Sequence, residues 1–136
     1  MVEQGVISFL SELHVGILSI PRQDRAPHST PVWYQYESDY SIWFLADRNS
    51  QKGKLLSVGS KLSFVVQSEN LPYRYISIEG IVASVAPVDI ESDLRPIARF
   101  YLGKRGGDEY VSQSGETTSS RYTIAINKLM SYGVES

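Results

Sequence analysis

The stretch FLADRNSQKGKLLSVGSKLSFVV (Phe44–Val66) sets a polar, basic segment between two apolar runs that have the character of strands. The first run ends at Ala46 and the second begins at Leu62. Three cationic residues stand within eight residues of the end of the first run: Arg48, Lys52 and Lys54. Positive charge therefore gathers where one strand ends, in a chain whose formal net charge is −2.

The polar segment NSQKGKLLSVG (49–59) has the features of a short helix. Asn49 or Ser50 could cap its first turn, because a side-chain oxygen there accepts a hydrogen bond from a free backbone N–H. Gly59 would end it. The opening stretch thus predicts a strand, a short helix and a second strand.

Alternation of apolar and polar residues predicts further strands on both sides of this stretch. The expected strands are residues 14–20, 28–38, 39–47, 61–67, 75–88 and 121–134. Polar turns join the first three, which are therefore expected to form a meander. Gly80 marks a bulge or a close backbone approach, and the last strand is expected to bend near Asn127.

Two longer helices are expected outside the strands. Apolar residues between Val2 and Leu13 fall along one helical face, which predicts a helix over residues 2–12. Asp89 carries a cap signal for a second helix that ends at the glycine pair 106 and 107. Residues 108–120 are polar and are expected to form a loop.

These elements predict a mainly β (α+β) fold in a single domain spanning residues 1–136. Six mostly antiparallel strands with peripheral helices favour a closed or partly closed barrel, and a sandwich is the competing layout. The order of elements lacks the repeated βαβ units of a doubly wound sheet, so a Rossmann cofactor site is not expected.

Composition excludes several classes of function. The chain has no cysteine, so disulfides and thiolate chemistry are excluded and a cytoplasmic location is expected. The N-terminal stretch has an early acid and no basic region, and polar residues interrupt its apolar runs, so neither a signal peptide nor a membrane-spanning segment is expected there. A pI near 5.7 argues against broad binding to nucleic acid or to membranes. Neither His14 nor His28 has carboxylates at metal-ligand spacing, so no metal site is expected.

Several segments, taken in order, resemble a known family. They are LSI, PHSTPVW, IWFLADRNSQKGKLL, KLSFVV and YISIEGIV. Together they resemble the split-barrel flavoproteins related to pyridoxamine 5′-phosphate oxidase, from about Leu10 to Val134. The later segments YRYISIEG and IARFYLGKRGGDEYV are similar to the branch whose members use the deazaflavin coenzyme F-420 as well as FMN.

The resemblance implies a homodimer of six-stranded split barrels, with the flavin or deazaflavin in the groove between the subunits. The family's phosphate-binding segment, where the third strand enters a short helix, falls on Arg48, Ser50, Gln51 and Lys52. The segments that line the ring fall on Thr30, Pro31, Val32, Trp33, Phe44, Leu45 and Ala46, and Tyr75 is expected to approach a cofactor held by the partner. The chain departs from the family in the turn QDRAP, where Asp-Gly is usual, and at Leu55, where asparagine is usual.

The residues themselves fit an anion site at this place. A helix N-terminus offers free N–H groups, Arg48 can meet a phosphate with two parallel hydrogen bonds, and Lys52 adds a point charge. The alternative is a solvated basic turn. Trp33 could form a wall of the ring pocket, or equally could be a packing or dimer contact. Tyr75 could approach the cofactor, or equally could be a sheet-edge or interface contact with no ligand role.

The expected function is that of an oxidoreductase that transfers a hydride between F-420 or FMN and a small conjugated organic substrate. F-420 is favoured by the later segments, and no side chain is assigned as a catalytic acid or base. Pyridoxamine phosphate oxidase activity itself is not expected. The alternative is a carrier that binds a flavin, haem or tetrapyrrole without turnover.

Overall fold

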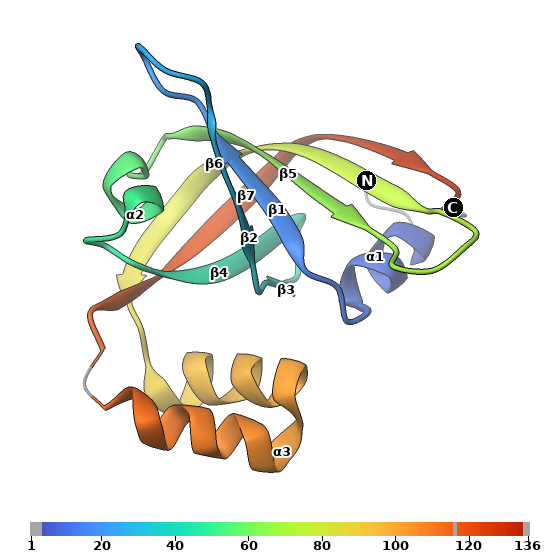
Figure 1. The fold of residues 1–136 in the computed structure, drawn as a ribbon. Coiled ribbons are helices and arrows are strands. Elements are labelled where there is room, and N and C mark those ends of the chain that lie inside the picture. The colour runs from blue at the N-terminus through green and yellow to red at the C-terminus, as the bar shows by residue number, and fades with distance from the viewer. Residues whose placement is uncertain (1–3, 116, 135–136) are drawn as a thin grey trace.

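A curled antiparallel sheet dominates the computed structural model, which describes residues 4–115 and 117–134 (Figure 1). The strands are β1 (Gly16–Ile20), β2 (His28–Val32), β3 (Gln35–Tyr36), β4 (Ser41–Asp47), β5 (Lys61–Gln67), β6 (Tyr75–Pro87) and β7 (Ser119–Tyr132). The helical elements are α1 (Gln4–Ser11), α2 (Gln51–Leu55), the π-helical turn η1 (Ile90–Leu94) and α3 (Arg95–Ser114). The strands are ordered β2-β1-β5-β6-β7-β4-β3, which confirms the predicted antiparallel split barrel with peripheral helices, although the sheet has seven strands where six were expected.

The predicted second strand, residues 28–38, is broken into β2 and β3. β2 pairs with β1 at one edge of the sheet and β3 pairs with β4 at the other. Between them, the backbone N–H of Tyr34 donates to the hydroxyl of Tyr101 at 3.1 Å rather than to a neighbouring strand. The prediction of a three-stranded meander is therefore wrong, because the chain crosses the open side of the half-barrel at Trp33 and Tyr34.

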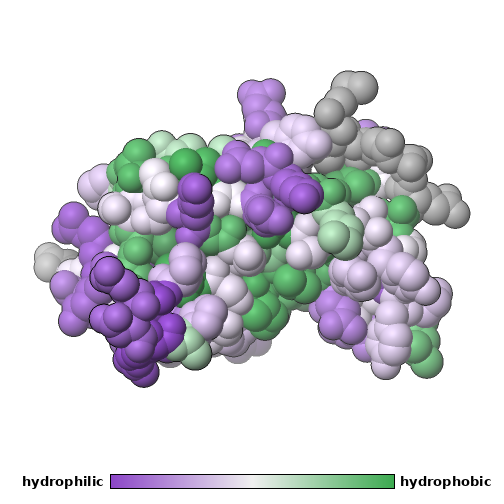
Figure 2. Space-filling view, turned by 90° about the horizontal axis from the view of Figure 1, so that it is seen from above, coloured by the Kyte–Doolittle hydropathy of each residue, from purple (hydrophilic) through white to green (hydrophobic). Residues whose placement is uncertain are grey.

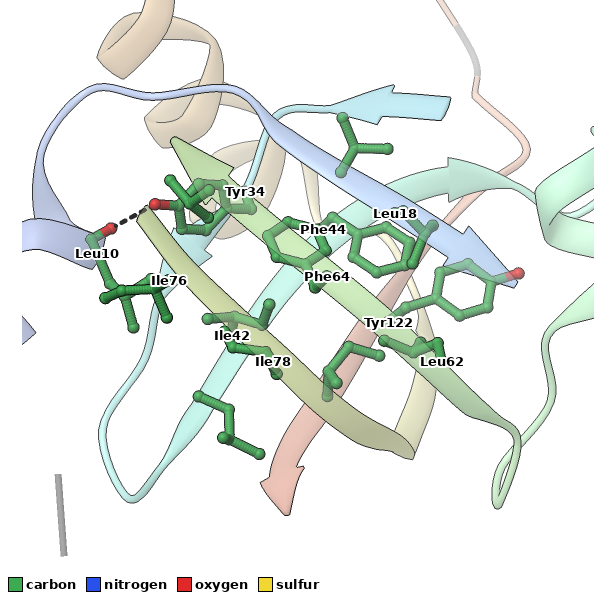
Figure 3. Packing of buried hydrophobic residues seen from close by; sticks show 14 of the residues in the cluster. Leu10, Leu18, Tyr34, Ile42, Phe44, Leu62, Phe64, Ile76, Ile78 and Tyr122 are labelled. Carbon is green, nitrogen blue, oxygen red and sulfur yellow. Dashed lines mark hydrogen bonds between the residues drawn. The ribbon is translucent and has the colours of Figure 1, made fainter. Parts of the chain in front are cut away.

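The core lies inside the curl of the sheet. It is built mainly from the strand residues whose side chains point inward. Figure 3 shows side chains from several strands meeting there. The rings of Phe44 and Tyr122 stack with their centroids 5.5 Å apart, and the hydroxyl of Tyr34 donates to the carbonyl of Leu10 at 2.8 Å. Each fully buried large apolar side chain contributes about 1.5–3 kcal/mol to folding. This core keeps the strands that position the site rigid.

The long strands β6 and β7 pair along almost their whole length with two irregularities. Glu79 pairs with Lys128 and Gly80 with Ile126, so Asn127 is an extra residue in β7. The bulge expected at Gly80 and the bend expected near Asn127 are therefore confirmed. The bend lets β7 follow the curl of the sheet.

The N-terminal end of the barrel is held by a buried histidine. His14 lies between two carboxylates, with Nε2 2.9 Å from Glu12 and Nδ1 2.9 Å from Glu69. Arg74 also pairs with Glu12, at 3.2 Å. This cluster ties the end of α1 to the loop between β5 and β6, a contact across 55 residues that local spacing could not reveal.

α3 is a helical hairpin, because the chain turns at Gly103 (φ 79, ψ 169) and runs back beside itself (Figure 1). Helix extends to Ser114, so the prediction of a loop from residue 108 onward is wrong for residues 108–114. The glycine pair at 106 and 107 is not a stop signal. A Cβ on Gly107 would lie 2.5 Å from the backbone nitrogen of Arg99, so the glycine allows the two arms to touch. None of the described helices is long and apolar enough to cross a membrane.

We expect the hairpin to loosen in acid through Asp108. Arg95 and Arg99 each donate to its Oδ1 at 2.8 Å from the opposite arm, and they lower the pKa of Asp108 from an ordinary 3.8 to about 2, Arg99 contributing most. A carboxyl with a lowered pKa in the folded state stabilises above its ordinary pKa and loses that effect as pH falls through its folded value. The contribution of the ionised Asp108 carboxyl to the stability of the folded state should therefore be constant above about pH 4.5 and lost between about pH 4 and 2.

The measurement is the melting temperature of the wild type and of Asp108→Asn across this pH range. The difference between the two proteins should shrink below about pH 4, because the wild-type carboxyl becomes neutral as well. An equal difference at pH 6 and at pH 2.5 would show that the ion pairs do not hold the arms together.

Candidate functional site

A cavity of about 500 Å³ lies between the open side of the barrel and the helical hairpin. The barrel supplies one wall, made of Val15, Pro31, Val32, Trp33, Leu45, Ala46, Asp47 and Ser119. The hairpin and the turn before it supply the other wall, made of Leu94, Ile97 and Tyr110. Lys52 reaches the cavity from α2. The crossing of the chain at Trp33 brings both edge regions of the sheet, β2 and β4, to one place.

Half of the residues predicted for the cofactor line this cavity: Pro31, Val32, Trp33, Leu45, Ala46 and Lys52. Asp47, which was not predicted, also lines the cavity. It pairs with Ser119, another lining residue, at the start of β7. Residues far apart in the sequence thus form one mostly apolar wall with a single ammonium group at its edge.

The other predicted residues lie elsewhere. Phe44 is fully buried in the barrel core, so its side chain does not face the cavity. Thr30 pairs with Leu18 in the hairpin of β1 and β2. Arg48, which precedes α2, and Gln51, the first residue of α2, are both exposed. Tyr75 lies at the far end of β6, where it stacks on Tyr132, so it does not belong to the cavity of its own chain.

Ser50 has a structural role that differs from the predicted one. Its hydroxyl donates to the carbonyl of Asp47 at 2.6 Å and accepts from the N–H of Gly53 at 3.1 Å, so it caps α2 and its one proton is engaged. The cap was predicted, but the proton is not free for a phosphate as expected. α2 also ends at Leu55 rather than near Gly59, so an anion here depends on side-chain cations more than on a helix dipole.

Charge in the cavity comes from two groups, Lys52 and Asp47. Asp47 accepts hydrogen bonds from the hydroxyl of Thr118 at 2.7 Å and from the N–H of Asn49 at 2.8 Å. These bonds, the one from Thr118 first, lower the pKa of Asp47, so it is ionised at neutral pH. Within the described residues Lys52 has no carboxylate within 4.0 Å.

Trp33 is fixed by aromatic neighbours. Its ring stacks on Tyr101 with centroids 4.9 Å apart and an angle of 7°, and Tyr110 lies 5.5 Å away at 50°. The hydroxyl of Tyr101 in turn donates to the carbonyl of His14 at 2.6 Å. Burial raises the pKa of Tyr101, so this hydroxyl keeps its proton. One face of Trp33 is thus packed against protein, and only the rest of the ring can line the cavity.

The hairpin wall was missed by sequence reasoning. Leu94 and Ile97 carry the helical spacing that predicted the helix, but nothing in that spacing says what the helix covers. Tyr110 was assigned to a loop. The segment DEYVSQS did contain a helical signal, because Tyr110 and Val111 stand three and four residues after Gly107. The glycine pair at 106 and 107 was interpreted as a helix end, so this spacing was not used.

No family model and no curated protein matches this chain. Solved structures do match it over nearly its whole length. An F420 reductase is 20% identical with a TM-score of 0.66, covering 95% of this chain and 98% of its own. An FAD-binding protein from Mesorhizobium loti is 16% identical with a TM-score of 0.62, covering 91% and 87%. The haem storage protein HutZ from Vibrio cholerae is 13% identical with a TM-score of 0.67, covering 97% and 95%.

The fold is the split barrel that the family resemblance implies. It is shared by proteins of the pyridoxamine 5′-phosphate oxidase-like class and by the three structures above. The cavity of this split barrel has a volume within the range of small-molecule sites, about 300–1,000 Å³. A mostly apolar wall next to the ammonium group of Lys52 suits a flat ring system that carries an anionic tail, which is the chemistry of a flavin-type cofactor.

Proposed function

We propose that this protein is an oxidoreductase that binds F-420 or FMN in the cavity and passes a hydride between the cofactor and a small conjugated organic molecule. The ring would lie against the barrel wall of Pro31, Val32, Leu45 and Ala46. Its anionic tail would meet Lys52, together with Gln51 at the start of α2 and Arg48 just before it. The cofactor supplies the hydride chemistry, and the protein supplies position and electrostatics.

The observation that carries this proposal is the position of Lys52. It is half-buried, has no carboxylate partner among the described residues and stands at the edge of an otherwise mostly apolar cavity. Its aliphatic stem can cover the apolar wall while its ammonium group reaches the anionic tail of a bound cofactor. The F420 reductase that shares the fold supports F-420 as the first cofactor to test, with FMN second.

We also propose that the protein is a cytoplasmic homodimer, paired through the outer face of the sheet. The register sets Pro31, Ile17, Val65, Ser77 and Met130 in one row across five strands. Ile17 is 43% exposed and Met130 60%. Apolar surface also crosses the middle of the molecule in the view from above (Figure 2). Pro31 belongs to this row and to the cavity wall, so a second copy could bring its Tyr75 near the cofactor.

A second candidate is a carrier that holds a flavin, haem or tetrapyrrole without turnover. HutZ, a haem storage protein, shares the fold and supports it. The described lining contains no histidine, cysteine or methionine, which are the commonest axial ligands of haem iron. Tyr110 lines the cavity, and tyrosine can also ligate haem iron, so haem stays among the ligands to test.

The deciding experiment is a titration of the purified protein with F-420, FMN and haem, followed by a test of turnover. Micromolar binding of F-420 or FMN, and reoxidation of the bound reduced cofactor by an added acceptor, are expected. Tight binding without reoxidation by any acceptor would identify a carrier. Failure of all three ligands to bind would exclude both functions.

A further inference from the structure

A second cavity, of about 510 Å³, lies on the outer face of the sheet beside the turn that joins β1 and β2. Its volume is within the range of small-molecule sites. The turn projects beyond the sheet (Figure 1) and contributes Pro21 and Pro27 to the lining. The polar lining residues are Ser19, Lys61, Ser63, Ser77, Glu79 and Asn127. This polar pocket and the cofactor cavity share no lining residue.

The floor of the polar pocket belongs to a polar row of the sheet. The register places side by side, on five neighbouring strands, Ser29, Ser19, Ser63, Glu79 and Lys128. The next row contains Ile17, Val65 and Met130 and belongs to the proposed dimer face. The outer face therefore changes from apolar to polar within a few residues. The pocket lies at the polar end, and Ser77 is its one lining residue that the row of the dimer face also includes.

The bulge between β6 and β7 adds an amide group to this pocket. Asn127 is the extra residue in β7, and its side chain is exposed. A Cβ on Gly80 would lie 2.7 Å from Cγ2 of Ile124 and 2.9 Å from the carbonyl oxygen of Ala125, so the strands approach closely here because residue 80 is glycine. Bulges redirect side chains and are frequent next to functional sites. The irregularity thus adds an amide, which can both donate and accept hydrogen bonds, to the hydroxyls of the floor.

Two opposite charges line the same pocket. Lys61 is two residues before Ser63, the direct partner of Glu79, so the ammonium group and the carboxylate come from neighbouring strands. Among the residues that the structure describes, neither group makes an ion pair within 4.0 Å. A ligand with a net charge would be attracted by one of them and repelled by the other. A ligand that carries both a carboxylate and an ammonium group can pair with both, since lysine only donates and ionised glutamate only accepts hydrogen bonds.

We propose that the polar pocket is a second binding site of this protein, for a small zwitterion of the free amino acid class. The carboxylate of the ligand pairs with Lys61, and its ammonium group pairs with Glu79. The hydroxyls of Ser63 and Ser77 and the amide of Asn127 form hydrogen bonds with a polar, uncharged side chain. Binding here does not require an occupied cofactor cavity.

The test is a titration of the purified protein with L-glutamine, followed through the NMR signals of the backbone amides. L-Glutaminamide, which lacks the carboxylate, and N-acetyl-L-glutamine, which lacks the ammonium group, are titrated in parallel. Glutamine should bind with a dissociation constant of about 1 mM or lower and at least about ten-fold more tightly than either analogue. The shifted signals should belong to residues of the polar pocket, such as Ser63, Glu79 and Asn127, and not to Ala46 of the cofactor cavity.

Lys61→Met and Glu79→Gln test the two charged contacts separately. Both side chains are exposed, so both variants should fold. Each should weaken binding of glutamine by about ten-fold or more. Lys61→Met should not weaken binding of glutaminamide, which has no carboxylate to lose a partner. Glu79→Gln, for the same reason, should not weaken binding of N-acetylglutamine.

Lys128→Met is the matched control. Lys128 is directly opposite Glu79 on the same face, is exposed and does not line the pocket. It should bind glutamine within about three-fold of the wild type, because an exposed charge in water interacts weakly.

Three results would overturn the proposal. One is that glutamine at about 10 mM leaves the signals of the pocket residues unchanged. Another is that both analogues, or glycerol, bind as tightly as glutamine, which would show that the two charges are not recognised. The third is that Lys61→Met and Lys128→Met act alike. None of these results bears on the cofactor cavity, since F-420 and FMN are absent from the titration.

Discussion

Lys52→Ala is expected to weaken cofactor binding by about 1–3 kcal/mol, which corresponds to roughly five- to 150-fold in the dissociation constant. The reason is the loss of a charge-assisted hydrogen bond to the anionic tail in a site where Lys52 has no other described partner. Because the ammonium group makes no ion pair with any described residue, its removal should leave the melting temperature without cofactor nearly unchanged. Titration by fluorescence or absorbance gives the affinity, and calorimetry of the free protein gives the stability.

Lys54→Ala is the control for this experiment. Lys54 is in the same helix, carries the same charge and is exposed away from the cavity lining. It should bind the cofactor within about two-fold of the wild type, because an exposed charge in water interacts weakly. Equal losses for both lysines would indicate a diffuse basic turn, and no loss for Lys52→Ala would remove the phosphate assignment.

The strands were predictable because each buries one face. Alternation in β5, β6 and β7 follows the pleat, so inward positions such as Phe64 and Tyr122 can be assigned from the sequence. β4 is a continuous apolar run that buries Ile42, Trp43 and Phe44 in succession, so alternation does not assign its inward face. The cap of α2 was predictable for the same local reason, since Ser50 acts on residues three positions away. Local periodicity therefore gave the right fold class.

The break at Trp33 and Tyr34 was not predictable from alternation. Residues 28–38 keep the pattern of one long strand, and Tyr34 is buried as that pattern requires. The strand ends because the backbone N–H of Tyr34 has a partner, the hydroxyl of Tyr101, that is 67 residues away. A hydrogen bond of that sequence separation leaves no trace in local periodicity.

The site was predictable only on its barrel side. Residues on β2, β4 and α2 could be assigned because the family resemblance and the charge pattern both lie in contiguous segments. The hairpin wall comes from a tertiary contact in which Leu94, Ala98 and Val111 pack with Trp33 and Leu45. These residues were visible as an apolar helix face, but the surface that the face covers is set by the tertiary fold.

Gly53→Ala is expected to destabilise the protein by about 3 kcal/mol, although the same change in an exposed helix would stabilise it by up to about 1 kcal/mol. Gly53 is buried, and a Cβ there would lie 2.1 Å from the carbonyl oxygen of Asp47 and 2.8 Å from the Cα of Arg48. Both contacts are with backbone, so no rotamer change can relieve them. The helix must move away from the end of β4, which also breaks the bond from the N–H of Gly53 to Ser50.

Whether Gly53→Ala destabilises or stabilises the protein shows how closely α2 packs on β4. Chemical denaturation of Gly53→Ala measures it, and cofactor titration of the folded fraction measures the consequence for the site. Affinity should fall by about ten-fold or more, because displacement of α2 moves Lys52 relative to Asp47 and the apolar wall. A stabilised Gly53→Ala protein with unchanged affinity would mean that the end of β4 and α2 are loosely joined. In that case the position of Lys52 would not depend on the close contact between Gly53 and the backbone of Asp47 and Arg48.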